Sequence, residues 1–174
     1  MNYVSVVALA GIALLLAGCG KSEPDLDDSK VVDKLLEDAL EGSKMQQRGP
    51  VGEQLIYAPN EQQPYTGWVK EMHPNGQVAD LISYKDGKRT AWTGWHENGQ
   101  KRTEGTYKNG KLEGLVTGWH ENGQKKREVP YKDGELHGLE TTWHENGQKW
   151  QEYTHKDGKE DGLRTTWYEN GQKW

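Results

Sequence analysis

The pattern of hydrophobic and polar residues divides the chain into three parts. An apolar run of 13 residues (16 − 4 + 1 = 13) extends from Val4 to Leu16. A second part has apolar residues at helical spacing, and the third and longest part alternates apolar with polar residues between closely spaced turns. The pattern therefore predicts an N-terminal targeting segment, one helix and a β-sheet, in that order.

The helical pattern follows a polar, acidic segment, residues 21–29, which has too little apolar surface to order itself and predicts a tether. Asp28 or Ser29 is placed to cap the helix, and Gly42 is placed to end it. The apolar residues at helical spacing are Val32, Leu35, Leu36, Ala39 and Leu40. We expect one amphipathic helix of about 14 residues, which covers the following sheet or, as the alternative, recruits a partner.

A hexapeptide of the form Trp-His-Glu-Asn-Gly-Gln recurs along the third part. Copies begin at Trp95, Trp119 and Trp143, and a Tyr-containing copy begins at Trp167, so the spacing is 24 each time (119 − 95, 143 − 119, 167 − 143). A degenerate copy begins at Met72. With the turns between copies, nine Asn-Gly or Asp-Gly dipeptides, at 75, 86, 98, 109, 122, 133, 146, 157 and 170, predict a continuous antiparallel meander. Leu55–Tyr57 predicts an earlier strand.

The length of the turns decides which side chains share a face. Two-residue loops would place the Trp and Tyr columns on opposite faces. Three-residue loops with the glycine in a bulge pair Trp119 with Lys125. We expect the second register because it collects the apolar residues Leu115, Trp119, Val129 and Tyr131 on one face, and likewise Leu139, Trp143 and Tyr153. The opposite face would then carry His120 and Glu128.

The composition predicts a thin, extended sheet. Only 32% of residues are hydrophobic and Phe is absent, whereas Trp and Tyr supply 8 residues each, so burial depends on amphipathic aromatics. The expected fold class is mainly β: a single-layer antiparallel meander of two-strand repeats with one short N-terminal helix. Lys and Arg number 22 against 27 Asp and Glu, and the net charge of −5 disfavours nucleic acid and phospholipid headgroups as ligands.

The repeat unit, Gly-x-x-x-x-Trp-His-Glu-Asn-Gly-Gln-Lys followed by Tyr-Lys-Asp-Gly-Lys-x-x-Gly, resembles the MORN-variant repeats of bacterial proteins. The likeness covers residues 53–174, although Thr90 takes the place of the leading glycine in the second unit. Proteins named as the YwqK family of toxin–antitoxin antitoxins are built from a similar unit. The resemblance implies a β-meander, a binding role and no catalysis.

The single cysteine excludes a disulfide framework. It ends the sequence Leu16-Ala17-Gly18-Cys19, which resembles a bacterial lipobox; a small buried cysteine in a core helix is the alternative. The resemblance implies a signal peptide over residues 1–18 and acylation of Cys19. Residues 19–50 would then hold the acylated cysteine, tether and helix, and 51–174 the repeats. Gly20, where lipoproteins retained in the inner membrane have Asp, implies the outer membrane, facing the periplasm.

The repeated polar residues make poor catalytic or metal-binding candidates. Equivalent histidines lie two strands apart, about 9.6 Å, while ligands of one zinc ion lie within about 4 Å of each other. We expect these histidines to be solvated or packed against the turns, and the glutamates to be turn residues. The sequence thus predicts a protein that is no enzyme, with no cofactor and no metal site. The residues concerned are His73, His96, His120 and His144, and Glu97, Glu121, Glu145 and Glu169.

A helix of about 21 Å cannot cover a sheet more than about 40 Å wide, so aromatic surface should stay exposed and bind a partner. The candidate partner-binding residues are Trp95, Trp119, Trp143, Trp167, Tyr107 and Tyr131. The leading hypothesis is a lipid-anchored module that binds a protein, and the resemblance implies a toxin. The alternatives are a module that binds cell-wall glycan and a structural spacer. The C-terminal strand, which we expect to be an unpaired edge, suggests self-association.

Overall fold

The computed structural model describes residues 24–174, and Cys19 with the predicted signal peptide lies outside this range. No helix within residues 24–174 is long and apolar enough to cross a membrane. The elements in chain order are α1 (Ser29–Asp38), β1 (Leu40–Glu41), η1 (Gly42–Lys44), β2 (Gln46–Arg48), β3 (Leu55–Tyr57), β4 (Gly67–Met72), β5 (Val78–Lys85), β6 (Lys88–Trp95), β7 (Lys101–Lys108), β8 (Lys111–Trp119), β9 (Lys125–Lys132), β10 (Glu135–Leu136), β11 (Gly138–Trp143), β12 (Lys149–Lys156), β13 (Lys159–Glu160) and β14 (Thr165–Thr166).

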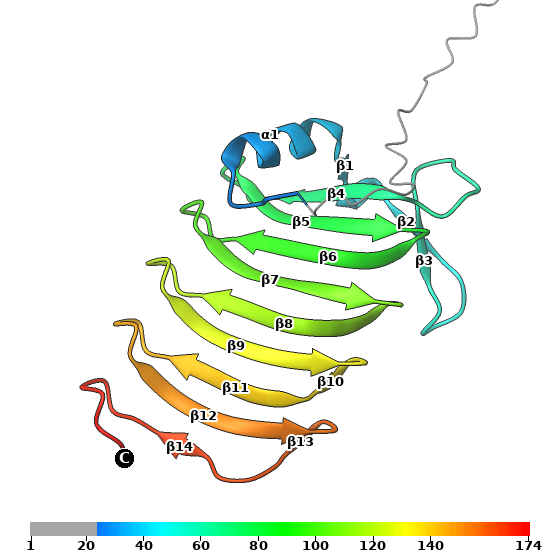
Figure 1. Ribbon diagram of the computed structural model, residues 1–174. Coiled ribbons are helices and arrows are strands. Elements are labelled where there is room, and N and C mark those ends of the chain that lie inside the picture. The colour runs from blue at the N-terminus through cyan, green and yellow to red at the C-terminus, as the bar shows by residue number, and fades with distance from the viewer. Residues whose placement is uncertain (1–23) are drawn as a thin grey trace, which may run out of the picture.

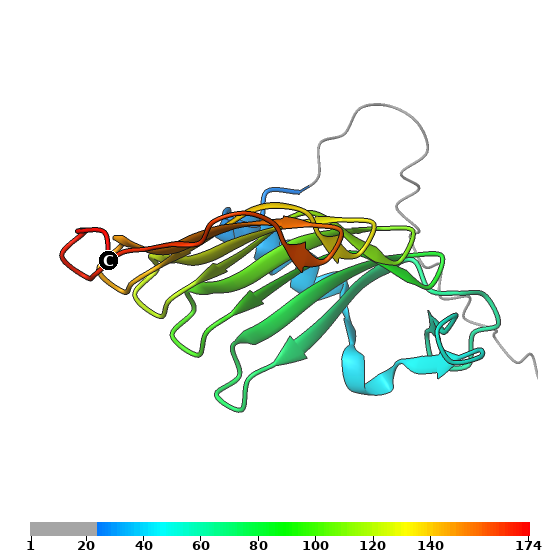
Figure 2. The same ribbon diagram turned by 90° about the horizontal axis from the view of Figure 1, so that it is seen from below.

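The predicted meander is confirmed. In one 12-stranded sheet, β4 to β9 and then β11 and β12 follow one another in chain order, each antiparallel to the one before. The short strand β10 pairs with β9, and β13 and β14 both pair with β12. Figure 1 shows these strands stacked like rungs, with α1 beside the first of them, and Figure 2 shows the sheet as one layer. The expected strand at Leu55–Tyr57 forms, but it pairs with β2 in a separate two-stranded sheet.

Two kinds of turn alternate along the meander. In the hexapeptide turns the main-chain N–H of His120 donates to Gln124, and only Gly123 has positive φ, so the loop has three residues. In the intervening turns both residues have positive φ, as with 50° at Asp86 and 75° at Gly87, and Lys85 pairs directly with Lys88. These loops have two residues, so the prediction of three-residue loops holds at one edge of the sheet only.

The predicted sharing of one face by the Trp and Tyr columns is wrong. Trp119 pairs with Lys125 as expected, but the next pair is Gly118 with Arg127, so Lys126 is an additional bulged residue. The bulge reverses the side-chain parity.

As a result, Leu115 pairs with Pro130 on one face of the sheet, while Tyr131 pairs with Gly114 and its side chain lies on the other face. Tyr153, paired with Glu140, likewise faces away from Leu139. Glu128 pairs with Thr117 and therefore lies on the same face as Trp119 and not, as expected, on the opposite one. We call the two sides the Trp face and the Tyr face.

Helix α1 covers the first strands on the Trp face. Asp28 is its N-cap and accepts a hydrogen bond from the Lys30 N–H at 2.9 Å, as the sequence predicts. Val32 and Ala39 pack with Leu81 and Trp95 in the main buried cluster. The helix has 10 residues, fewer than expected, because Leu40 and Glu41 leave it to pair in parallel with β4.

The residues just before α1, Pro24 to Asp28, are called the leader below, and the expected free tether is absent there. Leu26 packs against the buried cluster, and an Asp27 carboxylate oxygen lies 2.5 Å from Lys101 Nζ on β7. One leucine and one ion pair therefore fix a segment whose composition is otherwise polar.

The C-terminal strand is not a fully open edge. After β14 the chain turns back, Trp167 bridges to Lys173, and the Trp174 N–H donates to the Thr166 main-chain oxygen at 2.9 Å. The last residues therefore pair with part of the edge that the sequence predicts to be free. Self-association through this edge stays a prediction.

Candidate binding faces of the sheet

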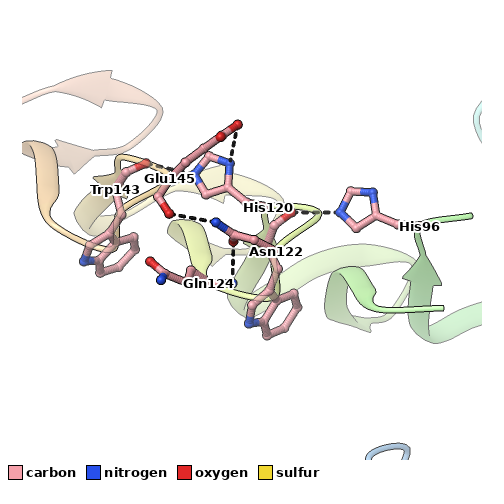
Figure 3. A network of polar contacts seen from close by, with 7 residues as sticks. His96, His120, Asn122, Gln124, Trp143 and Glu145 are labelled. Atoms are coloured by element: carbon pink, nitrogen blue, oxygen red, sulfur yellow. Dashed lines mark hydrogen bonds and ion pairs between the residues drawn. The ribbon is translucent and has the colours of Figure 1, made fainter. Parts of the chain in front are cut away.

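The repeated histidines join each turn to the next. His120 Nε2 lies 3.1 Å from the main-chain oxygen of Trp143, and His96 makes the same contact with Trp119 at 3.0 Å (Figure 3). Because a carbonyl oxygen only accepts, the histidine Nε2 carries the donated proton. The prediction that these histidines pack against the turns is confirmed.

The repeated asparagines complete this ladder. Asn122 Oδ1 accepts from the Gln124 N–H at 3.0 Å, while its Nδ2 donates to the Glu145 main-chain oxygen at 2.8 Å (Figure 3). The glutamate thus contributes its main chain, as a turn residue does. Among residues 24–174, no group of three His, Cys, Asp or Glu side chains is arranged to hold a metal ion. The contacts within and between the turns therefore explain the repeated hexapeptide as a structural motif.

The Trp face carries a row in which tryptophan alternates with lysine. Lys101 Nζ lies 5.4 Å from the ring centre of Trp119, and Lys125 Nζ lies 5.9 Å from that of Trp143. Lys149 and Lys173 lie at 5.8 and 5.9 Å from the Trp167 ring. Lys125 and Lys149 also pair with Glu128 and Glu152 on their own strands. The ammonium groups of Lys125 and Lys149 are thus each shared between a ring and a carboxylate.

Residues 24–174 cover only the N-terminal part of the Trp face. Trp95 is buried, and the Lys101 side chain is 17% exposed beneath the leader, compared with 51% for Lys125 and 48% for Lys149. Burial opposes the charged form of Lys101, but its hydrogen bonds to Asp27 and Glu104 outweigh this and raise its pKa. Beyond the leader, Trp119, Trp143 and Trp167 are half-buried and the face is open to solvent.

Three leucines recur along the repeats: Leu115 and Leu139 share the Trp face with Trp119 and Trp143, and Leu163 lies between β13 and β14. Leu115, Leu139 and Leu163 are 48%, 52% and 91% exposed. They recur at the repeat spacing of 24 (139 − 115, 163 − 139), which is the signal that could have identified them as a set. Leu115, Leu139 and the three half-buried tryptophans form the open part of the Trp face.

The Tyr face combines tyrosine with arginine. Arg89 Nε donates to the Tyr84 hydroxyl at 3.1 Å, and the Arg164 guanidinium lies 4.5 Å from the centre of the Tyr153 ring. Burial raises the pKa of Tyr153, and its hydrogen bond to Glu140 adds to this. Arg127, opposite Gly118, is exposed. These arginines follow no regular spacing in the sequence, so the repeat pattern does not predict them as candidate binding residues.

Trp92 anchors the N-terminal end of the Tyr face. Its ring centre lies 5.3 Å from that of Tyr107, and its ring occupies the space that a β-carbon on Gly105 would need. Beyond it, Val116 and Val129 pair across strands and are 6% and 4% exposed, although no second layer covers them among residues 24–174. On β9, Val129 lies between Arg127 and Tyr131 on the same face.

The six candidate partner-binding residues are divided between the two faces. Trp95, Trp119, Trp143 and Trp167 lie on the Trp face, with Trp95 already buried against α1, whereas Tyr107 and Tyr131 lie on the Tyr face. A single partner surface cannot contact all six at once. Their binding role stays a prediction, and the acylation site, Cys19, is outside the described residues.

A family model described as the MORN repeat variant matches the chain in four tandem segments, residues 91–109, 112–133, 136–157 and 160–174. No curated protein matches this chain. The structural repeat begins earlier than the matched segments, because His73 Nε2 lies 2.9 Å from the Trp95 oxygen and Asn75 donates to the Glu97 oxygen at 3.1 Å. The degenerate copy therefore keeps the contacts that join one turn to the next.

Proposed function

Since this chain is a tandem MORN-variant repeat protein, we propose that it is a non-catalytic, lipid-anchored module that holds a protein partner on its Tyr face. The observation that supports this most is the composition of that face. Trp92, Tyr107, Tyr131 and Arg127 are the residue types that dominate binding energy at protein interfaces. They lie on the same face of the sheet as the buried Val116 and Val129.

The anchor is proposed at Cys19, on the resemblance of Leu16 to Cys19 to a lipobox. Acyl chains on this residue would hold the module on the cell envelope, with Gly20 favouring the outer membrane and the periplasmic side. The partner class that the YwqK-type resemblance suggests is a toxin, which the module would bind as an antitoxin or immunity protein does.

The test is partner capture from envelope extracts with matched variants of the two faces. Tyr131→Ala and Arg127→Ala should each reduce the yield of captured partner at least about tenfold, since truncating a central aromatic or arginine costs about 2 kcal/mol or more. Trp143→Ala, on the opposite face, is the matched control and should leave capture unchanged. Circular dichroism verifies the fold of each variant.

The reverse result, capture lost with Trp143→Ala and kept with Tyr131→Ala, would place the partner on the Trp face. Retention on purified peptidoglycan with no captured protein would favour the glycan-binding alternative. Either outcome contradicts the proposal.

A further inference from the structure

A two-residue loop joins β7 to β8, and Asn109 is its first residue. The equivalent loops have aspartate at this position, at Asp86, Asp133 and Asp157. All four residues have the same positive φ, between 50° and 52°. Both Asn109 and the following Gly110 are exposed. The loop therefore presents an Asn-Gly pair to water, and glycine has no side chain to hinder its main-chain nitrogen.

The Asn109 loop lacks contacts that the equivalent loops make. In those loops the glycine N–H donates to a main-chain oxygen of the preceding unit, as Gly134 does to Leu112 at 2.8 Å. Among residues 24–174, the Gly110 N–H has no such acceptor and the Asn109 amide makes no hydrogen bond. The preceding unit is the irregular one, in which Thr90 replaces the leading glycine and does not adopt its positive φ. The missing contact thus coincides with a break in the repeat.

The asparagines of the hexapeptide turns are held by three hydrogen bonds each. Asn122 donates through Nδ2 to the next turn at 2.8 Å and accepts through Oδ1 within its own turn at 3.0 Å. The N–H of Gly123 donates to the main-chain oxygen of His120 at 3.0 Å. Asn98 and Asn146 have the same three contacts. In these turns, hydrogen bonds must break before the glycine nitrogen can reach the asparagine amide.

We propose that Asn109 is a site of spontaneous deamidation in the folded protein, while the asparagines of the hexapeptide turns are protected. The main-chain nitrogen of Gly110 attacks Asn109 Cγ, and a new C–N bond forms. The bond from Cγ to Nδ2 breaks, and ammonia leaves with the proton of the Gly110 nitrogen. The resulting succinimide then takes up one water molecule. Opening at Cγ gives aspartate, and opening at the main-chain carbonyl gives isoaspartate.

The two products have different effects on the loop. Aspartate is the residue that the equivalent loops already carry, and it suits the same positive φ, as at Asp86. Isoaspartate adds one carbon atom to the main chain and so disturbs the direct pairing of Lys108 with Lys111 across the loop. Either product adds one negative charge two positions from Tyr107, a residue of the Tyr face.

The test is incubation of the purified protein at neutral pH, followed by digestion with a protease that cleaves after glutamate. Glutamates separate the turns, so each asparagine falls in its own peptide. Residues 105–113 contain Asn109, while the three hexapeptide turns give residues 98–104, 122–128 and 146–152. Mass spectrometry follows deamidation of each peptide with time, and chromatography against synthetic standards separates aspartate from isoaspartate.

Asn109 should react at least about tenfold faster than the other three asparagines, because their turns must lose two or more hydrogen bonds before they react. In guanidinium chloride, where all turns are open, the four peptides should react at similar rates. Asn109→Asp should abolish the change in its peptide and leave the other three peptides as they were.

Equal rates for the four asparagines in the folded protein would overturn the inference, as would no reaction at Asn109 during a period in which the denatured chain reacts. An excess at Asn109 that persists in denaturant would also overturn it, since the local sequence and not the fold would then set the rate.

Discussion

His120 Nε2 donates a hydrogen bond of 3.1 Å to the main-chain oxygen of Trp143, a residue 23 positions later in the chain. The same contact occurs at His73, His96 and His144, so each turn along this edge binds the one that follows it. These contacts explain why the same polar turn sequence recurs in every repeat.

Replacing His120 with Ala should destabilise the protein by about 1 kcal/mol, because the Trp143 oxygen loses a donor in a partly buried site. Urea denaturation measures the difference. Glu121→Ala is the matched control in the same turn, since Asn98 binds the main-chain oxygen of Glu121 and the substitution keeps that atom. Equal destabilisation by the two variants would contradict the assigned role of the histidine.

Gly105→Ala should destabilise the sheet by about 1–3 kcal/mol through overpacking. The Trp92 ring lies where the new methyl group would have to be. In the double variant Trp92→Leu, Gly105→Ala the smaller side chain makes room, so the loss should be less than the sum of the two single losses. Additive losses in thermal or urea unfolding would show that ring and methyl group do not compete for space.

Asp80 should give the stability a pH dependence in the acidic range. Burial raises its pKa in the folded protein, even though Arg102 at 2.9 Å, with His73 and Arg89, acts in the opposite direction. A raised carboxyl pKa means that folding favours the protonated form, so this contribution is present at low pH and is lost as pH rises through the folded-state pKa.

In the variant Asp80→Asn the side chain cannot ionise, so the variant does not lose stability in this way as pH rises. Its free energy of unfolding, relative to that of the unmodified chain, should therefore increase between about pH 3 and pH 7. Denaturation series at several pH values measure the trend. A relative stability that decreases with pH would mean that the attraction between Asp80 and Arg102 outweighs the effect of burial.

Removing the carboxylates of Glu128 and Glu152, which pair with lysines on the Trp face, should strengthen binding to anionic lipid. With Glu128→Gln and Glu152→Gln, Lys125 and Lys149 lose their partners, and each freed charge near an anionic surface contributes about 1 kcal/mol. Sedimentation with phosphatidylglycerol vesicles at low salt measures the gain. Glu121→Gln and Glu135→Gln, which remove carboxylates outside the ion pairs described above, form the control pair with the same change in net charge.

Cys19→Ala should release the protein from the membrane fraction. The reason to expect an anchor is the apolar run that ends at Leu16, three residues before the cysteine (19 − 16 = 3). Cell fractionation and immunoblotting compare the variant with the unmodified chain. A variant that remains as firmly bound as the original would disprove the anchor, since the proposed acyl chains are then unnecessary.

The turns could be predicted because their chemistry is local. Asp-Gly at 86–87 and Asn-Gly at 122–123 specify hairpins regardless of the rest of the chain, and the meander follows from their regular spacing. The Asp28 cap is equally local, since its side chain binds an N–H two residues away. For the candidate site, the sequence therefore predicts which residues occupy equivalent positions in successive repeats, such as Trp119 and Trp143.

The two faces could not be predicted because one residue per repeat breaks the alternation. The bulge at Lys126 depends on how two strands twist against each other, and no residue in the sequence announces it. The packing of Leu26 and the parallel pairing of Leu40 with Val69 depend on contacts distant in sequence. Such contacts exist only after the sheet has formed.

The contacts of each hexapeptide turn go forward to the next one, so a unit depends on its neighbours alone. An in-frame duplication of 24 residues would add one more set of histidine and asparagine donors, and the next turn would supply the main-chain oxygens that accept their hydrogen bonds. Each added unit would lengthen both faces by two strands, about 10 Å. Array length can therefore change over generations without loss of fold, while α1 and the leader, which contact the N-terminal half of the sheet, stay at the same end of the array.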